Sequence, residues 1–398
     1  MKRIGIYGGT FNPPHIGHME AAKHAVSALN LDKLLLIPDR IAPHKAIPEG
    51  SPDARQRYDM VCLGACKIPE AEVCDLELRR EGASYTYLTI LELRRQYPDA
   101  ELILLMGTDM FCSFQDWREP DTILKHASLG VFYRGDKNET QAIDLQKEVL
   151  EGQGAKVYLI RNPVIQISST DLRRMLAFDC ASPVLPDGVE KYIRAHNLYG
   201  MGASLKGLSM DDLQKVVLSL LKPNRVAHVL GCRDTAVQLA QRYGADVTDA
   251  ARAGLLHDIT KALDGPLQLT LCDEYGIMLS EFFEENPKTL HALTGSLVAE
   301  RIFGENPQVV SAVRYHTTGK ADMSLLEKII YVADYMEPNR NFPGVEELRA
   351  LAFADIDKAL KWGLEATIAQ LQEQGRNVSV ESRQALDHLN QLPKFHCV

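Results

Sequence analysis

The segment GGTFNPPHIGH, residues 8–18, decides the fold of the first half of this chain. It follows an apolar run at 3–7 that predicts a buried strand, and it precedes a helical stretch at 19–29. Gly8 and Gly9 let the backbone approach an anion without interference from a Cβ atom. A helix N-terminus adds free N–H groups, and His15 and His18 lie one helical turn apart. The segment therefore predicts a phosphate-binding strand–turn–helix, in preference to a plain turn with two surface histidines.

Strand and helix signals alternate through the rest of the first half. Amphipathic stretches, among them 54–67, 86–96 and 138–151, separate apolar runs at 33–38, 73–78, 101–107, 129–134 and 156–160. This alternation predicts βαβ units and a parallel sheet that is covered on both faces. In such sheets ligands bind at the carboxyl ends of the strands, which is where residues 8–18 lie.

The pattern changes after about residue 198. Gly200, Gly202 and Gly207 predict a flexible join, and strand signals are almost absent from residue 209 onward. A capping box at Ser209 and Asp212 begins a series of helices, with others expected at 226–243, 249–257, 290–303, 307–316, 325–335 and 356–373. We therefore expect an α/β domain at 1–199, a linker at 200–207 and an all-α domain at 208–398.

Composition narrows the class of protein. The chain has 398 residues, 45% of them apolar and 24% charged, with a net charge of −9. This balance argues against sequence-independent binding to nucleic acid or to a membrane surface. We expect no signal peptide, because too few apolar residues follow the first three. The sequence has no apolar run of membrane-spanning length, and its eight cysteines form no CxxC pair. We expect a cytoplasmic protein with reduced thiols and leave a homo-oligomer open.

Three further strings of the first half follow predicted strands. Pro43-His44-Lys45 places a cation at the expected ligand edge, and Gly107-Thr108-Asp109 places an acceptor for ribose hydroxyls there. Residues 168–173, SSTDLR, can hold phosphate through a helix N-terminus and through Arg173. A plain helix start is the alternative interpretation of this last string.

Histidines and aspartates recur in the helical half in a fixed order. Several of them lie within or at the end of apolar helices, where ionisable groups are costly unless they are paired or bind a metal. Histidine suits Zn, Fe or Mn, and an adjacent His-Asp pair can serve two metals. The predicted metal ligands are His228, His257, Asp258, His291, His316 and Asp334.

The strings of the first half resemble the bacterial nicotinate-nucleotide adenylyltransferases, over about residues 1–197. His15-Ile16-Gly17-His18 and residues 168–173 match the HxGH and Ser-Ser-Thr-x-x-Arg signatures of that superfamily, which implies a Rossmann-like fold. Pro43–Lys45, Tyr85-Thr86 and Trp117 match the nicotinate branch, in which the tryptophan stacks on the pyridine ring and backbone near the threonine holds its carboxylate. Asn12 and Ala42 depart from the aspartate and proline of many relatives.

This resemblance implies adenylyl transfer from ATP to nicotinate mononucleotide, giving deamido-NAD and pyrophosphate in NAD biosynthesis. Mg²⁺ would enter with the ATP phosphates. The implied catalytic residues are His15, His18, Lys45 and Arg173. The implied nucleotide-binding residues are Gly8, Gly9, Thr10, Phe11, Thr86, Gly107, Asp109, Trp117, Ser168, Ser169 and Thr170.

The order H…HD…H…H…D resembles the HD-domain phosphohydrolases, over about residues 208–390. The strings at 257–261, 291–295, 314–319 and 333–340 are similar to bacterial HD enzymes that cleave diadenosine tetraphosphate symmetrically to two ADP. The resemblance implies that Asp258 bridges two metals, with Asp258 and Lys261 in catalysis and with Lys261 and Arg340 contacting phosphate. It implies iron, while the ligand types also allow Mn or Zn.

Two alternatives remain open at this stage. The transferase acceptor could be nicotinamide mononucleotide or phosphopantetheine, against which Trp117 and Pro43–Lys45 count. The HD half could be a nucleotide-sensing module that regulates the first half. The favoured interpretation is a bifunctional enzyme.

Overall fold

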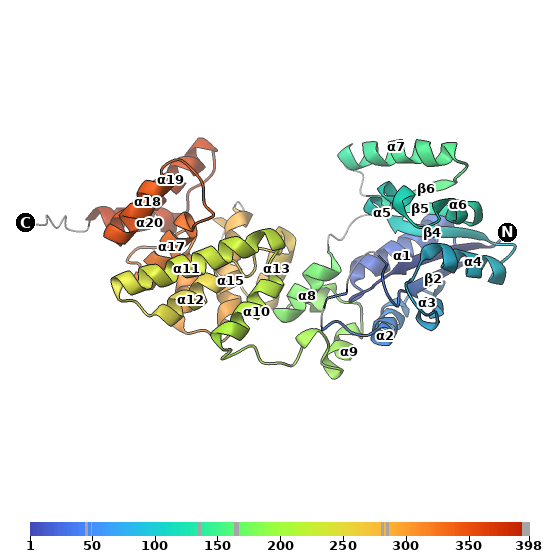
Figure 1. Ribbon diagram of the computed structural model, residues 1–398, viewed down its shortest axis with the longest axis horizontal. Coiled ribbons are helices and arrows are strands. Elements are labelled where there is room, and N and C mark those ends of the chain that lie inside the picture. The colour runs from blue at the N-terminus through green and yellow to red at the C-terminus, as the bar shows by residue number, and fades with distance from the viewer. Residues whose placement is uncertain are drawn as a thin grey trace, which may run out of the picture. The chain divides into compact units, whose positions relative to one another are not determined.

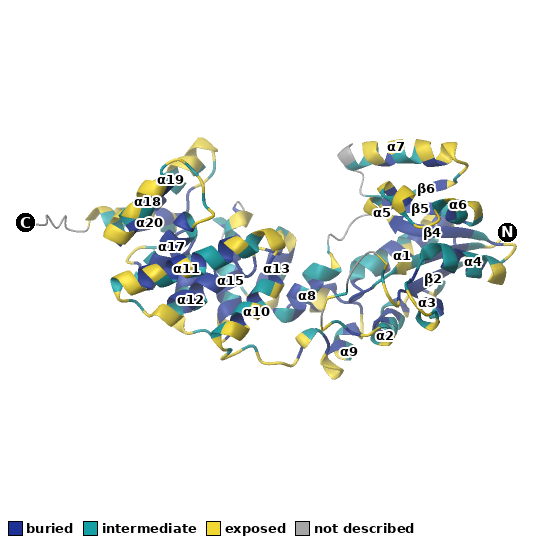
Figure 2. Cartoon of the chain, in the orientation of Figure 1, coloured by how far each residue is buried: buried dark blue, intermediate teal, exposed yellow. Residues whose placement is uncertain are grey.

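The computed structural model describes residues 1–43, 47–48, 50–133, 137–162, 167–279, 282–283 and 286–391. The chain forms two compact units (Figure 1). The first comprises Met1–Ala177 and Ala181–Ala203, and the second comprises Phe178–Cys180 and Ser204–Val398. Each unit has its own buried apolar core (Figure 2).

A six-stranded parallel sheet organises the first unit. Its strands are β1 (Arg3–Gly9), β2 (Lys33–Pro38), β3 (Ala71–Val73), β4 (Glu101–Gly107), β5 (Ser128–Tyr133) and β6 (Val157–Arg161). The strand order is β3-β2-β1-β4-β5-β6, and every neighbouring pair is parallel. The order reverses between β1 and β4, so a crevice opens at the carboxyl ends of these two strands. The predicted α/β fold with a parallel sheet is confirmed.

Helices cover both faces of this sheet because alternate strand residues point to opposite sides. Leu34 and Leu36 pack with α1 (Ile16–Leu29) and α2 (Ala54–Ala65), whereas Leu35 and Ile37 face the opposite side. The opposite face carries α4 (Thr86–Gln96), α5 (Thr108–Cys112), α6 (Pro120–His126) and α7 (Lys137–Gly152). The remaining helices of the unit are α3 (Leu76–Arg79), α8 (Ser169–Ala177) and α9 (Val189–Ala195).

The expected strand at 73–78 is largely wrong. β3 ends at Val73, and residues 76–79 form the short helix α3. β3 is an edge strand that pairs with β2 through three residues, Ala71, Glu72 and Val73. An edge strand gains hydrogen bonds from one neighbour, so an apolar run there does not ensure a long strand. The last residue of the run expected at 129–134 lies outside the described residues.

The second unit is helical in its described part, as predicted for an HD domain. Its α-helices are α10 (Met210–Leu220), α11 (Val226–Tyr243), α12 (Val247–Leu256), α13 (Gly265–Glu274), α15 (Leu290–Arg301), α16 (Pro307–Tyr315), α17 (Leu325–Met336), α18 (Val345–Ala354), α19 (Ile356–Glu373) and α20 (Val380–Gln391). Side-chain caps fix several of their starts, including Ser209, which accepts from the Asp212 N–H as predicted, and Asn306 on α16.

Two close contacts bring α11 against its neighbours. A Cβ atom on Gly254 of α12 would lie 2.7 Å from the Cα atom of Arg233 on α11, so glycine lets the two helices approach. A Cβ atom on Gly231 would meet the carboxylate of Glu337, just beyond α17. Within the described part of the chain, every helix is too short or too polar to cross a lipid bilayer.

Candidate active sites

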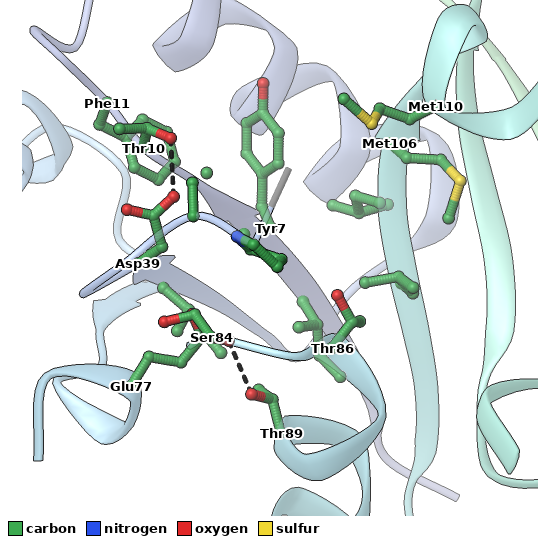
Figure 3. A pocket seen from close by; sticks show the side chains of 18 of the residues that line it. Tyr7, Thr10, Phe11, Asp39, Glu77, Ser84, Thr86, Thr89, Met106 and Met110 are labelled. Carbon is green, nitrogen blue, oxygen red and sulfur yellow. Dashed lines mark hydrogen bonds between the residues drawn. The ribbon is translucent and has the colours of Figure 1, made fainter. Parts of the chain in front are cut away.

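A cavity of about 450 Å³ opens at the crevice between β1 and β4 in the first unit (Figure 3). Its wall includes many of the residues singled out from the sequence, namely Gly8, Gly9, Thr10, Phe11, His18, Thr86, Gly107, Trp117 and Ser169. A Cβ atom on Gly8 would meet no other part of the described chain closer than 3.9 Å, so the fold itself does not require glycine there. A ligand that approaches the backbone would require it.

His15 and His18 stand together at the start of α1. Their rings stack with centroids 3.6 Å apart. The His15 N–H donates to Nδ1 of His18 over 3.2 Å, which leaves the proton of the neutral His18 ring on Nε2. Burial lowers the pKa of His15 to about 4, and burial together with the neighbouring His15 lowers the pKa of His18 well below its usual value. Both rings are therefore neutral at pH 7.

The string at 168–173 packs on the segment 8–18, just before its two histidines. Ser169 donates through Oγ to the Pro13 carbonyl over 3.0 Å, and Arg173 donates to the Asn12 carbonyl over 2.7 Å. Arg173 also donates to Oγ1 of Thr170. The two strings lie more than 150 positions apart in the sequence, and α8 brings them together beside the histidines.

A buried ion pair supports the loop after β1, and sequence reasoning missed it. Arg57 on α2 donates to Oδ1 of Asp39 over 3.0 Å and to the carbonyl oxygens of Thr10 and Asp39 over 2.6 and 2.8 Å. Thr10 in turn donates to Oδ2 of Asp39 over 2.6 Å (Figure 3). Arg57 is 1% exposed. One guanidinium group thus ties the loops after β1 and β2 together.

The remaining predicted residues of this site fall in three groups. Trp117 is half-buried against Phe114 and lines the cavity. Asp109 is exposed on α5, outside the described cavity lining, and Ser168 caps α8 by accepting from the Asp171 N–H. Lys45, with the neighbouring His44, lies outside the described residues.

Four buried histidines of the second unit share one hydrogen-bonding pattern. Nδ1 of His257, His291 and His316 lies 2.7–2.8 Å from the backbone carbonyls of Gly254, Lys288 and Val313. Nδ1 of His228 lies 3.0 Å from a carboxylate oxygen of Glu337. Carbonyl and carboxylate oxygens only accept, so in each ring Nδ1 carries the proton and Nε2 has a lone pair. Nε2 of His291, which carries this lone pair, lies 3.1 Å from Nζ of Lys261.

These lone pairs converge in two pairs on the two sides of Asp258. The Nε2 atoms of His228 and His257 are 3.2 Å apart, and those of His291 and His316 are also 3.2 Å apart. Oδ2 of Asp258 lies 3.6 Å from the first pair, whereas Oδ1 lies 3.2 and 3.8 Å from the second. Two acceptor lone pairs facing each other repel unless a cation lies between them.

The donor set therefore fits metal ions. Two groups of ligand atoms could each hold one, His228–His257–Asp258 and Asp258–His291–His316, and all these residues are buried. Oδ1 of Asp258 is buried and accepts no hydrogen bond from the described residues, although it forms an ion pair with Lys261. Asp334 joins the first group, with Oδ1 3.1 Å from Nε2 of His228. Each histidine also has the outer hydrogen bond typical of metal-ligating imidazoles.

Three cations surround these carboxylates. Arg340 contacts Oδ1 of Asp334 at 2.6 Å, Lys261 lies 3.3 Å from Oδ1 of Asp258, and Arg225 pairs with Oδ2 of Asp258. Burial lowers the pKa of Lys261 to about 8. Burial also lowers the pKa values of His257 and His291 to about 3, so both stay neutral at pH 7. The sequence reasoning assigned no role to Arg225 or to Glu337.

Comparisons with known proteins divide the chain at the same place. Residues 6–175 match the cytidylyltransferase-like family model, and residues 225–339 match the HD domain model. A protein of Dictyoglomus turgidum named "Probable nicotinate-nucleotide adenylyltransferase" is 36% identical over 198 residues, which are 50% of this chain and 95% of the relative. The symmetrical bis(5'-nucleosyl)-tetraphosphatase of Bacillus subtilis is 36% identical over 174 residues, 43% of this chain and 92% of the relative.

A solved structure matches one half of the chain. A predicted HD superfamily hydrolase involved in NAD metabolism from Clostridium acetobutylicum is 38% identical, covers 47% of this chain and 99% of its own, and has a TM-score of 0.45. Each of these relatives corresponds to about half of the present chain. The chain thus belongs to two families: its N-terminal half to the cytidylyltransferase-like nicotinate-nucleotide adenylyltransferases, and its C-terminal half to the HD-domain proteins that include the symmetrical tetraphosphatases.

Proposed function

We propose that the N-terminal unit transfers the adenylyl group of ATP to nicotinate mononucleotide, giving deamido-NAD and pyrophosphate. The observation that carries this proposal is the cavity at the switch point, where Gly8, Gly9, His18 and Ser169 face the same space as Trp117. Phosphate-binding groups and a flat aromatic surface in one cavity suit a mononucleotide with a planar base. The family membership supports the same reaction.

In this reaction the acceptor phosphate attacks the α-phosphorus of ATP, and pyrophosphate leaves. Positioning and charge neutralisation contribute most of the rate enhancement in such phosphoryl-type transfers. His18 lines the cavity, and its Nε2–H would donate to a phosphate oxygen, while the backbone at Gly8 and Gly9 would lie against the phosphates. Arg173, held by the Asn12 carbonyl and Thr170, would add positive charge. We propose Lys45 as a further cation, and Mg²⁺ would enter with the ATP phosphates.

The test is steady-state kinetics of the full chain with ATP and a panel of acceptors that includes nicotinamide mononucleotide and phosphopantetheine. We expect nicotinate mononucleotide to be the preferred acceptor. His18→Ala should lower kcat by orders of magnitude, while His24→Ala, on the same helix but outside the described cavity lining, should not. Equal turnover in the two variants would contradict the role of His18.

For the HD unit we propose symmetrical hydrolysis of diadenosine tetraphosphate to two ADP. His228, His257, Asp258 and Asp334 would hold one metal ion, and Asp258, His291 and His316 a second. Bound metal ions would polarise a phosphoryl oxygen and lower the pKa of water. Lys261, Arg340 and Arg225, each already oriented on a ligand carboxylate, would bind the oxygens of the polyphosphate.

Metal analysis and product analysis test this second activity together. The full chain should contain about two metal ions, of which we propose iron with Mn or Zn as alternatives, and it should release only ADP from diadenosine tetraphosphate. Asp258→Ala should remove both the metal and the hydrolysis, because one carboxylate faces both ligand pairs. Nucleotide binding without turnover would favour a sensing module instead. We propose 1–199 and 208–398 as the functional domains, joined by 200–207.

A further inference from the structure

The carboxylates and the arginine that line the cavity of the first unit differ in how they are paired. Its carboxylates are Asp39 and Glu77, and both are buried and bonded, Asp39 to Arg57 and Thr10, and Glu77 to Thr89 over 2.6 Å. Among the described lining residues, Arg118 is the one arginine or lysine. It immediately follows Trp117, the flat aromatic residue of the cavity wall.

Arg118 is exposed and makes no ion pair with a carboxylate of the described residues. Its guanidinium carbon lies 4.6 Å from the centre of the Tyr85 ring, just before Thr86 and helix α4. Thr86 lies in Figure 3 on the side of the cavity away from Thr10 and Phe11. Stacking on an aromatic face orients a guanidinium, and the interaction with the Tyr85 side chain engages only part of its five N–H donors.

The cavity thus offers two separate places for negative charge. One is at His18 and the glycines, and the other is at Arg118, with the aromatic surface of Trp117 next to it in the wall. A mononucleotide whose base carries no carboxylate needs only the first of these. A mononucleotide whose planar base carries a carboxylate satisfies both, and a guanidinium can bind that carboxylate through two N–H donors.

We propose that the Arg118 side chain recognises the carboxylate on the pyridine ring of the acceptor and thereby selects the acid over the neutral amide. This inference rests on the proposed adenylyl transfer and adds a specificity residue to it. The family resemblance places backbone near Thr86 at this carboxylate, and the side chain of Arg118 supplies a charge that backbone N–H groups lack. A carboxylate offers two acceptor oxygens to the guanidinium, whereas an amide offers one oxygen and one N–H₂ group. The N–H₂ donor would face a guanidinium N–H donor, and both would lack an acceptor.

The experiment measures kcat/KM of the full chain with nicotinate mononucleotide and with nicotinamide mononucleotide. Arg118→Gln should lower kcat/KM for the acid about ten- to hundredfold, mainly through KM, because a charge-assisted hydrogen bond is lost. It should change kcat/KM for the amide by less than about twofold. Arg118→Lys should retain part of the preference for the acid, and added salt should reduce that preference because the group is exposed.

Arg95→Gln is the matched control, because Arg95 is an exposed arginine of α4 outside the described cavity lining. Arg95→Gln should leave kcat/KM unchanged for both acceptors. The proposal is overturned if Arg118→Gln leaves the acid-to-amide ratio of kcat/KM unchanged, which includes the case in which it lowers kcat/KM equally for both acceptors. If the wild type adenylylates neither mononucleotide, the proposed function fails on its own. The ratio of the dissociation constants of the two mononucleotides, compared between wild type and Arg118→Gln, then decides the role of Arg118.

Discussion

The buried pair of Arg57 and Asp39 gives the sharpest prediction for the first unit. Arg57→Met keeps most of the aliphatic volume but leaves the Asp39 carboxylate without its cation and the carbonyls of Thr10 and Asp39 without a donor. Removing one partner of a buried pair costs about 3–5 kcal/mol. A domain with a total stability of about 5–15 kcal/mol would lose a large part of it.

Urea unfolding measures this loss in the full chain. The chain has two tryptophans, Trp117 in the first unit and Trp362 in the second, so Trp362→Phe leaves Trp117 fluorescence to report on the first unit. With an m value of about 2 kcal/mol/M, Arg57→Met should lower the unfolding midpoint by about 2 M. Arg55→Met is the control, because Arg55 pairs with Asp59 on the same helix but is 69% exposed. It should cost less than about 1 kcal/mol.

A double-mutant cycle separates the interaction energy of Arg57 and Asp39 from the cost of losing the packing of the Arg57 side chain. Asp39→Asn alone leaves the Arg57 guanidinium buried without its carboxylate, whereas the double variant leaves no unpaired charge. The two changes should therefore be non-additive by about 1–3 kcal/mol. If Arg57→Met shifts the midpoint no more than Arg55→Met does, or if the two changes add, the buried pair does not support the loop.

Three further predictions concern the histidines. Burial lowers the folded pKa of His15 to about 4, and each pKa unit is worth about 1.4 kcal/mol. As the pH falls, His15 takes up a proton in the unfolded state before it does so in the folded state. The free energy of unfolding of the first unit should therefore fall by about 3 kcal/mol between about pH 6.5 and pH 4. In urea unfolding measured across this pH range, His15→Gln should reduce the fall. Glu337→Gln should weaken metal binding by about tenfold or more in chelator competition, with exposed Glu347→Gln unchanged. Side-chain ¹⁵N NMR of the metal-free chain should find the proton on Nε2 of His18 but on Nδ1 of His257, and the same tautomer in both would contradict the hydrogen-bond assignment.

The sequence predicted the central part of the first unit better than its edges. The runs at 33–38 and 101–107 became β2 and β4 because both faces of a central strand are buried, which produces an unbroken apolar pattern. The run at 73–78 failed because β3 is at the edge of the sheet. Arg57 could not be predicted, since in the sequence it is one of several charged residues on an amphipathic helix. Its partner Thr10 lies 47 positions away, and only the packing of α2 on the sheet makes the arginine interior.

The second unit divides in a similar way. The order of His228, His257, Asp258, His291, His316 and Asp334 predicts them as metal ligands, and the structure brings their side chains together at Asp258 and His228. Glu337 and Arg225 gave no comparable signal, because a glutamate after a helix and an arginine before one are common. Their roles depend on tertiary contacts, such as the space that Gly231 leaves for the Glu337 carboxylate. Sequence order is enough to predict the ligands, whereas the groups that orient them depend on the packing.

In the proposed functions the two sites would use histidine for ligands of opposite charge, and one hydrogen bond to each ring decides which ligand it suits. At His18 a backbone N–H donates to Nδ1, so Nε2 carries the proton and offers a donor, which suits a phosphate oxygen. At His257, His291 and His316 a backbone carbonyl accepts from Nδ1, so Nε2 offers a lone pair, which suits a metal ion. A general preference for neutral histidine in buried places cannot produce this difference, because all of these rings have lowered pKa values. The group beside Nδ1 sets the sign of the ligand that the ring suits, and that group follows from where the histidine lies. His18 bonds back to the N–H that begins its helix. His257, His291 and His316 each reach the carbonyl three residues before them, and His228 reaches the Glu337 carboxylate.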